Sequence, residues 1–302
     1  MYDIVIIGAG PAGLTAATYS LRAGKTVLVI EKSGFGGQVA FSPKIENFPG
    51  IVSVSGSELA ERLVEQPLEL GAETVFGEVT GIHGTPGSFT VTTEDEEYAC
   101  KAIIIASGAK HRRLNVEGED TFAGNGVSYC AVCDGAFFAS QNVAIVGGGN
   151  SALQEAVLLS DICESVTIIQ NLPFLTGEAR LQEILNERKN VRIITSVTVD
   201  RLFGGEALEG AVIRHAETGE TETVRCTGLF VAIGLEPQNA AFADVVALDE
   251  QGYIIAGEDC RTSADGICAA GDCRTKSVRQ ITTAAADGAV ASVAVCRTID
   301  AL

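Results

Sequence analysis

Short apolar runs of strand length, separated by glycine-rich turns, dominate the pattern of hydrophobic and polar positions in this chain. The run Tyr2–Ile7 predicts a buried parallel strand, residues 11–23 predict the helix after it, and residues 25–30 predict a second strand. A turn at residues 8–13 connects the first strand to the helix. Strand, turn, helix and strand in this order predict a βαβ unit.

A second unit of the same kind begins near the middle of the chain. A strand at residues 143–146, a glycine-rich turn at 147–152, a helix to about residue 159 and a strand at 166–169 repeat the earlier order. The repetition predicts an α/β fold with two Rossmann-like nucleotide-binding domains, each built in three layers of the ββα type.

Two similar strand-to-glycine endings, at residues 102–108 and 228–234, mark the places where the chain crosses between domains. We therefore expect the second domain, residues 113–242, to be inserted into the first. The first domain is then discontinuous and consists of residues 1–112 and 243–302.

The first turn carries the glycine spacing typical of a dinucleotide-binding loop. Gly8 allows the tight turn, Gly10 lets the backbone approach a pyrophosphate, and Gly13 lets the helix pack on the sheet. The amino end of the helix, where Ala12 lies, would face the phosphates with the positive end of its dipole. Glu31, after the second strand, would accept hydrogen bonds from a ribose. The first domain is therefore predicted to bind a nucleotide cofactor.

Composition and charge exclude several classes of partner. The 302-residue chain is 46% hydrophobic, but its apolar runs are far shorter than the ~18 residues that span a bilayer. Its formal net charge of −18 argues against nucleic acid and anionic lipid, because both bind to basic patches. The sequence start lacks the basic segment of a signal peptide, so we expect a cytoplasmic protein whose cysteines mostly stay reduced.

A Cys-x-x-Cys motif, Cys130-Ala-Val-Cys133, is followed by Asp134 and lies between the two glycine-rich turns. In a reducing compartment such a close pair is more typical of redox catalysis than of a structural disulfide. A zinc site is not expected, because a second cysteine pair at ligand spacing is missing. A dithiol between two dinucleotide-type folds predicts electron transfer between a flavin and a disulfide. The other cysteines are expected to be small core residues: Cys100, Cys163, Cys226, Cys260, Cys268, Cys273 and Cys296.

These motifs together resemble the low-molecular-weight thioredoxin reductase family, along essentially the whole chain. The matching segments are residues 36–38, 45–50, 106–109, 130–135, 147–150, 228–234, 270–272 and 279–284. The resemblance implies an FAD cofactor, a thioredoxin substrate and a homodimer. It also implies that Cys133 exchanges electrons with the flavin, that Cys130 forms a mixed disulfide with the substrate, and that Asp134 acts as acid and base. A helix N-cap is the alternative role for Asp134.

The same resemblance assigns residues to the flavin. Asp272 would hydrogen-bond the ribityl chain, while Arg279, Gln280 and the neighbouring backbone would line the flavin. Gln38 and Asn47 match further flavin-contacting positions, and a turn-stabilising role is the alternative for Asn47. The remaining cofactor positions are Gly37, Val79, Gly108 and Ile281.

One segment departs from the family. Members that use NADPH carry arginines after the second strand of the inserted domain, and these hold the 2′-phosphate. Here residues 170–176 read Gln-Asn-Leu-Pro-Phe-Leu-Thr, without a cation and without the acid that would bind the ribose of NAD. Two or three lost contacts, at roughly 1.5–3 kcal/mol each, would exclude ordinary use of NADPH. We therefore interpret the second glycine turn as a structural remnant.

Without NADPH the flavin needs another electron source. In this respect the sequence is similar to the ferredoxin-dependent flavin thioredoxin reductases, which keep the dithiol and lack the NADPH motif. The similarity implies that reduced ferredoxin supplies the electrons. Since a net charge of −18 repels an acidic ferredoxin, a local basic surface is needed. Candidates for it are Lys110 and the segment His111-Arg112-Arg113, which is expected to be an exposed crossing between the domains.

Three other functions remain open at this point. A dithiol oxidase of the same fold would form a disulfide in its substrate and pass the electrons to O₂. A thioredoxin reductase of unusual sequence would bind NADH or NADPH through contacts that the motif does not reveal. The third is a non-enzymatic flavin redox sensor, which would leave Cys130, Cys133 and Asp134 without a catalytic use.

Overall fold

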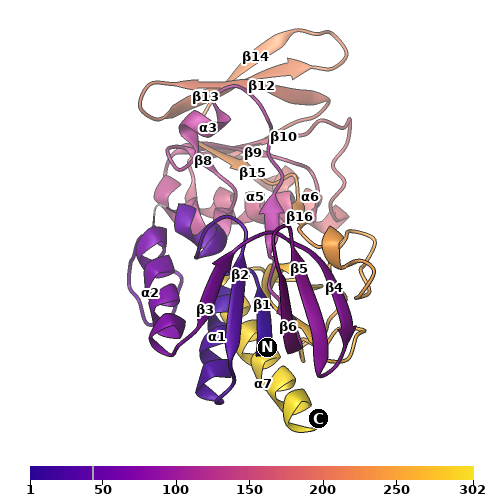
Figure 1. The fold of residues 1–302 in the computed structure, drawn as a ribbon. Coiled ribbons are helices and arrows are strands. Elements are labelled where there is room, and N and C mark those ends of the chain that lie inside the picture. Colours follow the sequence, from indigo (N-terminus) through magenta and orange to yellow (C-terminus); the bar gives the residue numbers. More distant parts are fainter. Residues whose placement is uncertain (43) are drawn as a thin grey trace. The chain divides into compact units, whose positions relative to one another are not determined.

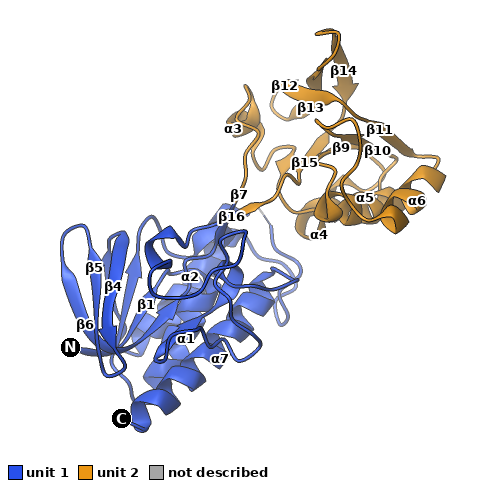
Figure 2. Ribbon diagram, turned by 90° about the vertical axis from the view of Figure 1, so that its right-hand side faces the viewer, with its two compact units in different colours: residues 1–110, 236–302 blue, residues 111–235 orange. Residues whose placement is uncertain are grey.

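The computed structural model describes residues 1–42 and 44–302, and the chain divides into two compact units (Figure 2). Unit 1 consists of Met1–Lys110 and Glu236–Leu302, and unit 2 is His111–Leu235. The sequence placed these boundaries at 112/113 and 242/243. The return to unit 1 comes earlier than expected, because the chain crosses within the short strand Leu235–Pro237 (β16) and not after it.

Within the described residues, unit 1 is built on a seven-stranded sheet of order β3-β2-β1-β6-β5-β4, with β17 paired to β6 (Figure 1). The pairs among β3, β2, β1, β6 and β17 are parallel, and those among β6, β5 and β4 are antiparallel. The strands are β1 (Tyr2–Ile7), β2 (Val27–Glu31), β3 (Glu73–Phe76), β4 (Val79–Thr85), β5 (Ser88–Thr93), β6 (Glu97–Ile105) and β17 (Ile267–Ala269). The helices are α1 (Pro11–Arg22), α2 (Gly56–Glu69) and α7 (Ile281–Asp300). Short 3-10 turns are η1 (Gly37–Phe41), η3 (Ala240–Phe242) and η4 (Gly271–Cys273), and the outward crossing lies in β7 (Ala109–His111).

Successive side chains of β1 point to opposite faces of this sheet, and each face packs against its own core. Ile4 and Ile6 belong to a core cluster that small side chains of α1 and α7 complete. Val5 and Ile7 belong to a second cluster, which includes Phe89 of β5. The side chains of residues 4–7 are all buried, as expected for a parallel strand between two layers.

Unit 2 repeats the layered plan with its own sheets. Its described residues form a parallel sheet of order β11-β10-β9-β15-β8 and an antiparallel sheet of order β12-β13-β14. The parallel strands are β8 (Val127–Ser128), β9 (Asn142–Val146), β10 (Ser165–Ile169), β11 (Val191–Ile194) and β15 (Gly228–Val231). The antiparallel strands are β12 (Val197–Gly204), β13 (Leu208–His215) and β14 (Thr221–Arg225). The helical segments are α3 (Glu119–Phe122), α4 (Ala131–Asp134), η2 (Gly135–Phe138), α5 (Asn150–Ile162) and α6 (Ala179–Glu187).

Side chains along β9 alternate between two cores in the same way. Ala144 and Val146 pack with the antiparallel sheet, and Val143 and Ile145 pack with α5. The α/β fold with two Rossmann-like sheets, expected from the sequence, is confirmed. None of the described helices combines the length and the apolar composition that crossing a bilayer requires.

Candidate active site

The glycine-rich loop between β1 and α1 has the geometry of a dinucleotide-binding loop. Gly8 has a φ of +103°, and a Cβ there would collide with the carbonyl oxygen of Ala106. A Cβ at Gly13 would collide with the carbonyl oxygen of Gly8. At Gly10, by contrast, a Cβ would meet no atom within 4 Å. Two glycines therefore allow close packing, while the backbone at Gly10 is open to a ligand.

Glu31, at the end of β2, ties this loop to the loop that follows. The carboxylate is buried; its Oε2 accepts a hydrogen bond from the Ala9 amide at 2.7 Å, and its Oε1 accepts one from the Ser33 amide at 2.8 Å. Oε1 also accepts bonds from the Ser33 hydroxyl at 3.1 Å and the Gly34 amide at 3.3 Å, so a ribose hydroxyl would have to bond to Oε2, which accepts only one from the described residues. The predicted ribose contact is therefore compatible with a structural role that sequence analysis did not anticipate.

Asp272, in η4, is the clearest sign of a ligand in unit 1. Its Oδ1 is buried and has no hydrogen-bond partner among the described residues. Burial raises the pKa of Asp272, and the nearby charges of Lys276 and Arg279 act in the opposite direction. A buried acceptor without a donor costs free energy, and a hydroxyl of the FAD ribityl chain would satisfy it. The orphaned oxygen and the open backbone at Gly10 both fit FAD.

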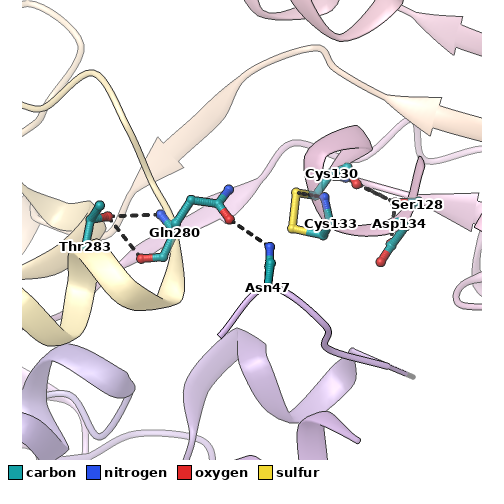
Figure 3. Close-up of a disulfide and its surroundings, with 7 residues drawn as sticks. All are labelled: Asn47, Ser128, Cys130, Cys133, Asp134, Gln280 and Thr283. Carbon is teal, nitrogen blue, oxygen red and sulfur yellow. Dashed lines mark hydrogen bonds between the residues drawn. A yellow bond between two sulfur atoms is a disulfide. The ribbon is translucent and has the colours of Figure 1, made fainter. Parts of the chain in front are cut away.

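Arg279 and Gln280 lie between η4 and α7. Arg279 donates from Nε to the carbonyl oxygen of Asp272 at 3.4 Å, and its guanidinium lies over the Tyr253 ring at 4.2 Å. Gln280 is the N-cap of α7, and Asn47 donates from Nδ2 to its Oε1 at 3.2 Å (Figure 3). Ile281 begins α7 directly after this cap. Together with Asp272, these contacts bring five of the predicted flavin positions together within unit 1.

The other predicted cofactor positions have simpler surroundings. Gln38 donates from Nε2 to a backbone carbonyl in β7. Gly37 and Gly108 have φ values of +58° and +71°, where glycine is favoured. The side chains of Ala12 and Val79 are buried in the two cores of unit 1, so both residues would meet FAD through their backbone.

A buried cluster of charged side chains, Arg274, Lys276 and Asp287, bonds to the backbone of the turn that carries Asp272. Asp287 of α7 accepts bonds from Arg274 Nη2 at 2.8 Å, from Lys276 Nζ at 2.8 Å and from the Gly271 amide at 3.0 Å. Burial acts to raise the pKa of Asp287, but the bonds from Arg274 and Lys276 outweigh it and hold this pKa below its usual range. Sequence analysis missed Asp287, whose only signal is an acid among the small residues of a long helix.

Cys130 and Cys133 form a disulfide in unit 2, with their Cα atoms 5.3 Å apart (Figure 3). Cys130 is the N-cap of α4, and its Sγ accepts a hydrogen bond from the Cys133 amide at 3.1 Å. An amide donor of this kind favours the charged form of a sulfur. The predicted dithiol is therefore placed where a thiolate would be stabilised after reduction.

Ser128 connects Asp134 to the dithiol (Figure 3). Its Oγ donates to Asp134 Oδ2 at 2.6 Å and accepts a bond from the Cys130 amide at 3.1 Å. Burial raises the pKa of Asp134, and the bond from Ser128 partly offsets this. The side chain of Asp134 caps no helix, so the N-cap alternative does not describe it. Asp134 is thus suited to hold a proton close to the sulfurs; Ser128, two residues before Cys130, was missed.

The remaining cysteines are core residues, as predicted. All of them are buried with free thiols. Burial raises the pKa of Cys100, Cys226 and Cys268 to about 12, so these thiols stay neutral and unreactive.

The segment that stands in place of the arginines packs against the second glycine loop at Gly148, whereas a Cβ at Gly149, the counterpart of Gly10, would meet, among the described residues, only Thr176 Oγ1 at 3.8 Å. Gln170 is buried, and a Cβ at Gly148 would lie 2.5 Å from its Cδ. Gln170 donates from Nε2 to the carbonyl oxygen of Phe174 at 3.2 Å. The amides of Thr176 and Gly177 donate to the carbonyl oxygen of Gly148 at 2.8 and 2.9 Å. The segment is thus folded onto the loop by its own hydrogen bonds.

An acid lies at the amino end of α5, where a pyrophosphate would bind in a Rossmann-like domain. Asn150, the first residue of α5, accepts a bond from the Glu178 amide at 2.7 Å and donates to Glu178 Oε1 at 3.2 Å. A carboxylate beside a phosphate is repulsive. The second loop therefore keeps the fold of a nucleotide site, while its surroundings oppose an anionic ligand.

Of the residues considered for a basic surface, Lys110, Arg112 and Arg113 are exposed, whereas His111 is not. His111 is half-buried against the Tyr129 ring, at 5.5 Å between centroids, and burial lowers its pKa. Arg113 pairs with Asp120 at 2.6 Å and with buried Glu119 at 3.6 Å. The expectation of an exposed cationic segment was wrong for His111, because packing on Tyr129 removes it from solvent.

Comparison with known proteins identifies the family to which this chain belongs. Residues 2–288 match the family model described as pyridine nucleotide-disulphide oxidoreductase. The chain belongs to this family. The thioredoxin reductase of Listeria monocytogenes is 40% identical to it over 292 residues, which cover 96% of this chain and 92% of the relative. That of Treponema pallidum is 38% identical over 302 residues, covering 100% and 98%.

A solved structure agrees with these sequence relatives. The thioredoxin reductase of Streptococcus pyogenes superposes with a TM-score of 0.96 at 39% identity, covering 100% of this chain and 99% of that one. This pyridine nucleotide-disulphide oxidoreductase is a flavoprotein of the thioredoxin reductase type, and FAD is its cofactor. The resemblance is confirmed at the level of the family, whereas the names of these relatives lend no support to its ferredoxin-dependent branch.

Proposed function

We propose that this protein reduces the disulfide of a thioredoxin through FAD and the Cys130–Cys133 pair, and that reduced ferredoxin replaces NADPH as electron donor. The observation that carries the choice of donor is the cation-free segment 170–176 beside the second glycine loop, with Glu178 at the start of α5. The names of the relatives support thioredoxin as the substrate.

FAD, when bound, supplies the two electrons that open the Cys130–Cys133 disulfide. The glycine loop of unit 1 would take its pyrophosphate, Glu31 a ribose and Asp272 the ribityl chain. The remaining residues that would line it are Ala12, Gly37, Gln38, Asn47, Val79, Gly108, Arg279, Gln280 and Ile281.

The reduced dithiol would pass the electron pair on by thiol–disulfide exchange. The Cys130 thiolate attacks the thioredoxin disulfide and bonds to one sulfur, and the other sulfur leaves and takes the proton held by Asp134. Cys133 then gives its proton to the Asp134 carboxylate and attacks Cys130 Sγ as a thiolate, which re-forms the protein disulfide. The second thioredoxin sulfur leaves as a thiolate and takes a proton from solvent. Both electrons end on the thioredoxin dithiol.

We further propose that unit 1 is the FAD-binding domain, that unit 2 is the inserted NAD(P)H-type domain, and that the protein is a cytoplasmic homodimer. The orphaned Asp272 oxygen of unit 1 and the cation-free segment 170–176 of unit 2 support the domain roles. The dimer and the location rest on the resemblance alone.

An anaerobic titration of the holoenzyme tests the donor. Micromolar NADPH is expected to leave the FAD absorbance unchanged, because 2′-phosphate contacts worth about three decades of affinity are missing. NADH is expected to do the same, because the acid that would bind its ribose is missing from residues 170–176. Reduced ferredoxin is expected to bleach FAD and to sustain thioredoxin reduction. Dithionite is the positive control for bleaching. Fast bleaching by NADPH would refute the ferredoxin proposal, and rapid O₂ consumption with a dithiol would favour the oxidase.

Replacing Asp272 by alanine is expected to weaken FAD binding about ten- to a hundredfold, because it removes a buried acceptor that only the ligand satisfies. The measurement is the FAD fluorescence released on dilution of the purified variant. Glu258→Ala removes an exposed carboxylate of the same unit and serves as the matched control. Equal FAD retention in both variants would argue against the assigned role of Asp272.

A further inference from the structure

Asn239 lies in unit 1, just after β16, the strand in which the chain returns from unit 2. It is 1% exposed, and although it is the N-cap residue of η3, its side chain makes no bond to that turn. Nδ2 donates instead to the carbonyl oxygens of Cys273 at 2.8 Å and Gly252 at 2.9 Å. Oδ1 accepts a bond from Ser107 Oγ at 2.9 Å. One buried amide therefore joins three separate segments of unit 1.

The two carbonyl partners fix the orientation of this amide. A carbonyl oxygen can only accept, so Nδ2 must face Cys273 and Gly252, and Oδ1 is left to face the Ser107 hydroxyl. Ser107 lies between β6 and β7, where the chain leaves unit 1. Asn239 thus connects both crossings of the chain to the backbone of Cys273.

Cys273 is the last residue of η4, and Asp272 is the middle residue of this turn. Side chains hold the backbone on both sides of Asp272. The Gly271 amide donates to Asp287 Oδ2 at 3.0 Å, and the Cys273 carbonyl accepts from Asn239. Between them, Asp272 Oδ1 is buried and has no partner among the residues that the structure describes. The turn is therefore fixed at both ends around an acceptor that a ligand would satisfy.

We propose that Asn239 is a positioning residue for FAD, which fixes the Cys273 end of the turn and so holds the Asp272 carboxyl ready for a ribityl hydroxyl. Its three bonds are made within the protein, so the turn is ordered before FAD binds and less conformational freedom is lost on binding. The inference rests on the proposed contact between Asp272 and FAD.

The test is a double-mutant cycle on FAD retention. Holoenzyme is diluted, and the fluorescence of released FAD gives its dissociation constant for wild type, Asn239→Ala, Asp272→Ala and the double variant. Asn239→Ala is expected to raise the constant about three- to tenfold in the wild-type background, because the turn loses a bond that orders it. In the Asp272→Ala background the same change is expected to have less than about a twofold effect, because the carboxyl that Asn239 positions is absent.

The cycle separates positioning from a general loosening of unit 1, which would weaken FAD binding by the same factor in both backgrounds. Equal factors overturn the proposal, and so does a wild-type dissociation constant for Asn239→Ala. Gln251→Ala, which removes an exposed amide next to Gly252, is the matched control and should leave FAD retention unchanged. A wild-type constant for Asp272→Ala would instead overturn the proposed flavin contact, and this inference with it.

The structure favours a folded variant. The Ile254 amide also donates to the Cys273 carbonyl, at 3.0 Å, so this carbonyl keeps one donor in Asn239→Ala. If Asn239→Ala nevertheless does not fold, Asn239→Ser takes its place in the cycle with the same expected factors. A serine side chain is polar but too short to bond to all three partners at once.

Discussion

Replacing Cys130 by serine is expected to lower the rate of thioredoxin reduction by at least about a thousandfold. The serine hydroxyl cannot supply the sulfur nucleophile that disulfide exchange requires, and no mixed disulfide can form. The measurement starts from holoenzyme whose FAD has been reduced chemically, so that the result does not depend on the donor. Thiols formed on added thioredoxin are then counted after one anaerobic turnover.

Two companion variants make this result specific. Cys133→Ser is expected to lose the same turnover, because the disulfide that receives the electrons cannot form. Cys296→Ser makes the same chemical change at a buried thiol near the hydroxyls of Ser20 and Ser292, and it should retain turnover. Thioredoxin reduction that survives Cys130→Ser would remove the dithiol from the mechanism.

Replacing Asp287 by asparagine is expected to lower the free energy of unfolding by about 3–5 kcal/mol. The change leaves Arg274, which is 3% exposed, and the buried Lys276 without the carboxylate that bonds to both. It also weakens the support of Gly271, next to Asp272. Urea denaturation of the holoenzyme, followed by circular dichroism, measures the loss, and FAD release should accompany it.

The pH dependence of this contribution has a definite sign. The pKa of Asp287 lies below its unfolded value, so the stabilisation is complete above the unfolded pKa of about 4. It is lost as the pH falls through the lower, folded value. Asp300→Asn, at the other end of α7, removes the exposed partner of Lys25 and should change stability by less than about 1 kcal/mol. Equal stability of the two variants would contradict the expected effect of Asp287.

Much of the fold and the chemistry was readable from the sequence, because the information lies in adjacent positions. The glycine spacing at residues 8–13 and the Cys-x-x-Cys pair are local motifs, and the structure builds both as expected. The apolar run Tyr2–Ile7 predicted a buried parallel strand, and β1 is that strand, with residues 4–7 buried. The strand-to-glycine ending at residues 102–108 is the end of β6, which begins at Glu97, where it pairs with the antiparallel β5.

Residues whose partners lie far along the chain were missed, because no pattern of adjacent positions reveals them. Asp287 meets Arg274 and Lys276 across a turn and a helix. This acid stands in no motif, and burial alone distinguishes it from the many solvated acids of a chain with net charge −18.

The sequence by itself determined two Rossmann-like domains, a nucleotide-binding glycine loop, a Cys-x-x-Cys dithiol and the absence of cations at residues 170–176, because each follows from residue type at short spacing. Only the tertiary structure decided that Gln170 covers Gly148, that Glu178 lies beside Asn150, and that the Asp272 oxygen lacks a partner. These facts depend on how separate strands and loops pack, which sets burial and distance, and burial and distance set the energy of a charge or a hydrogen bond.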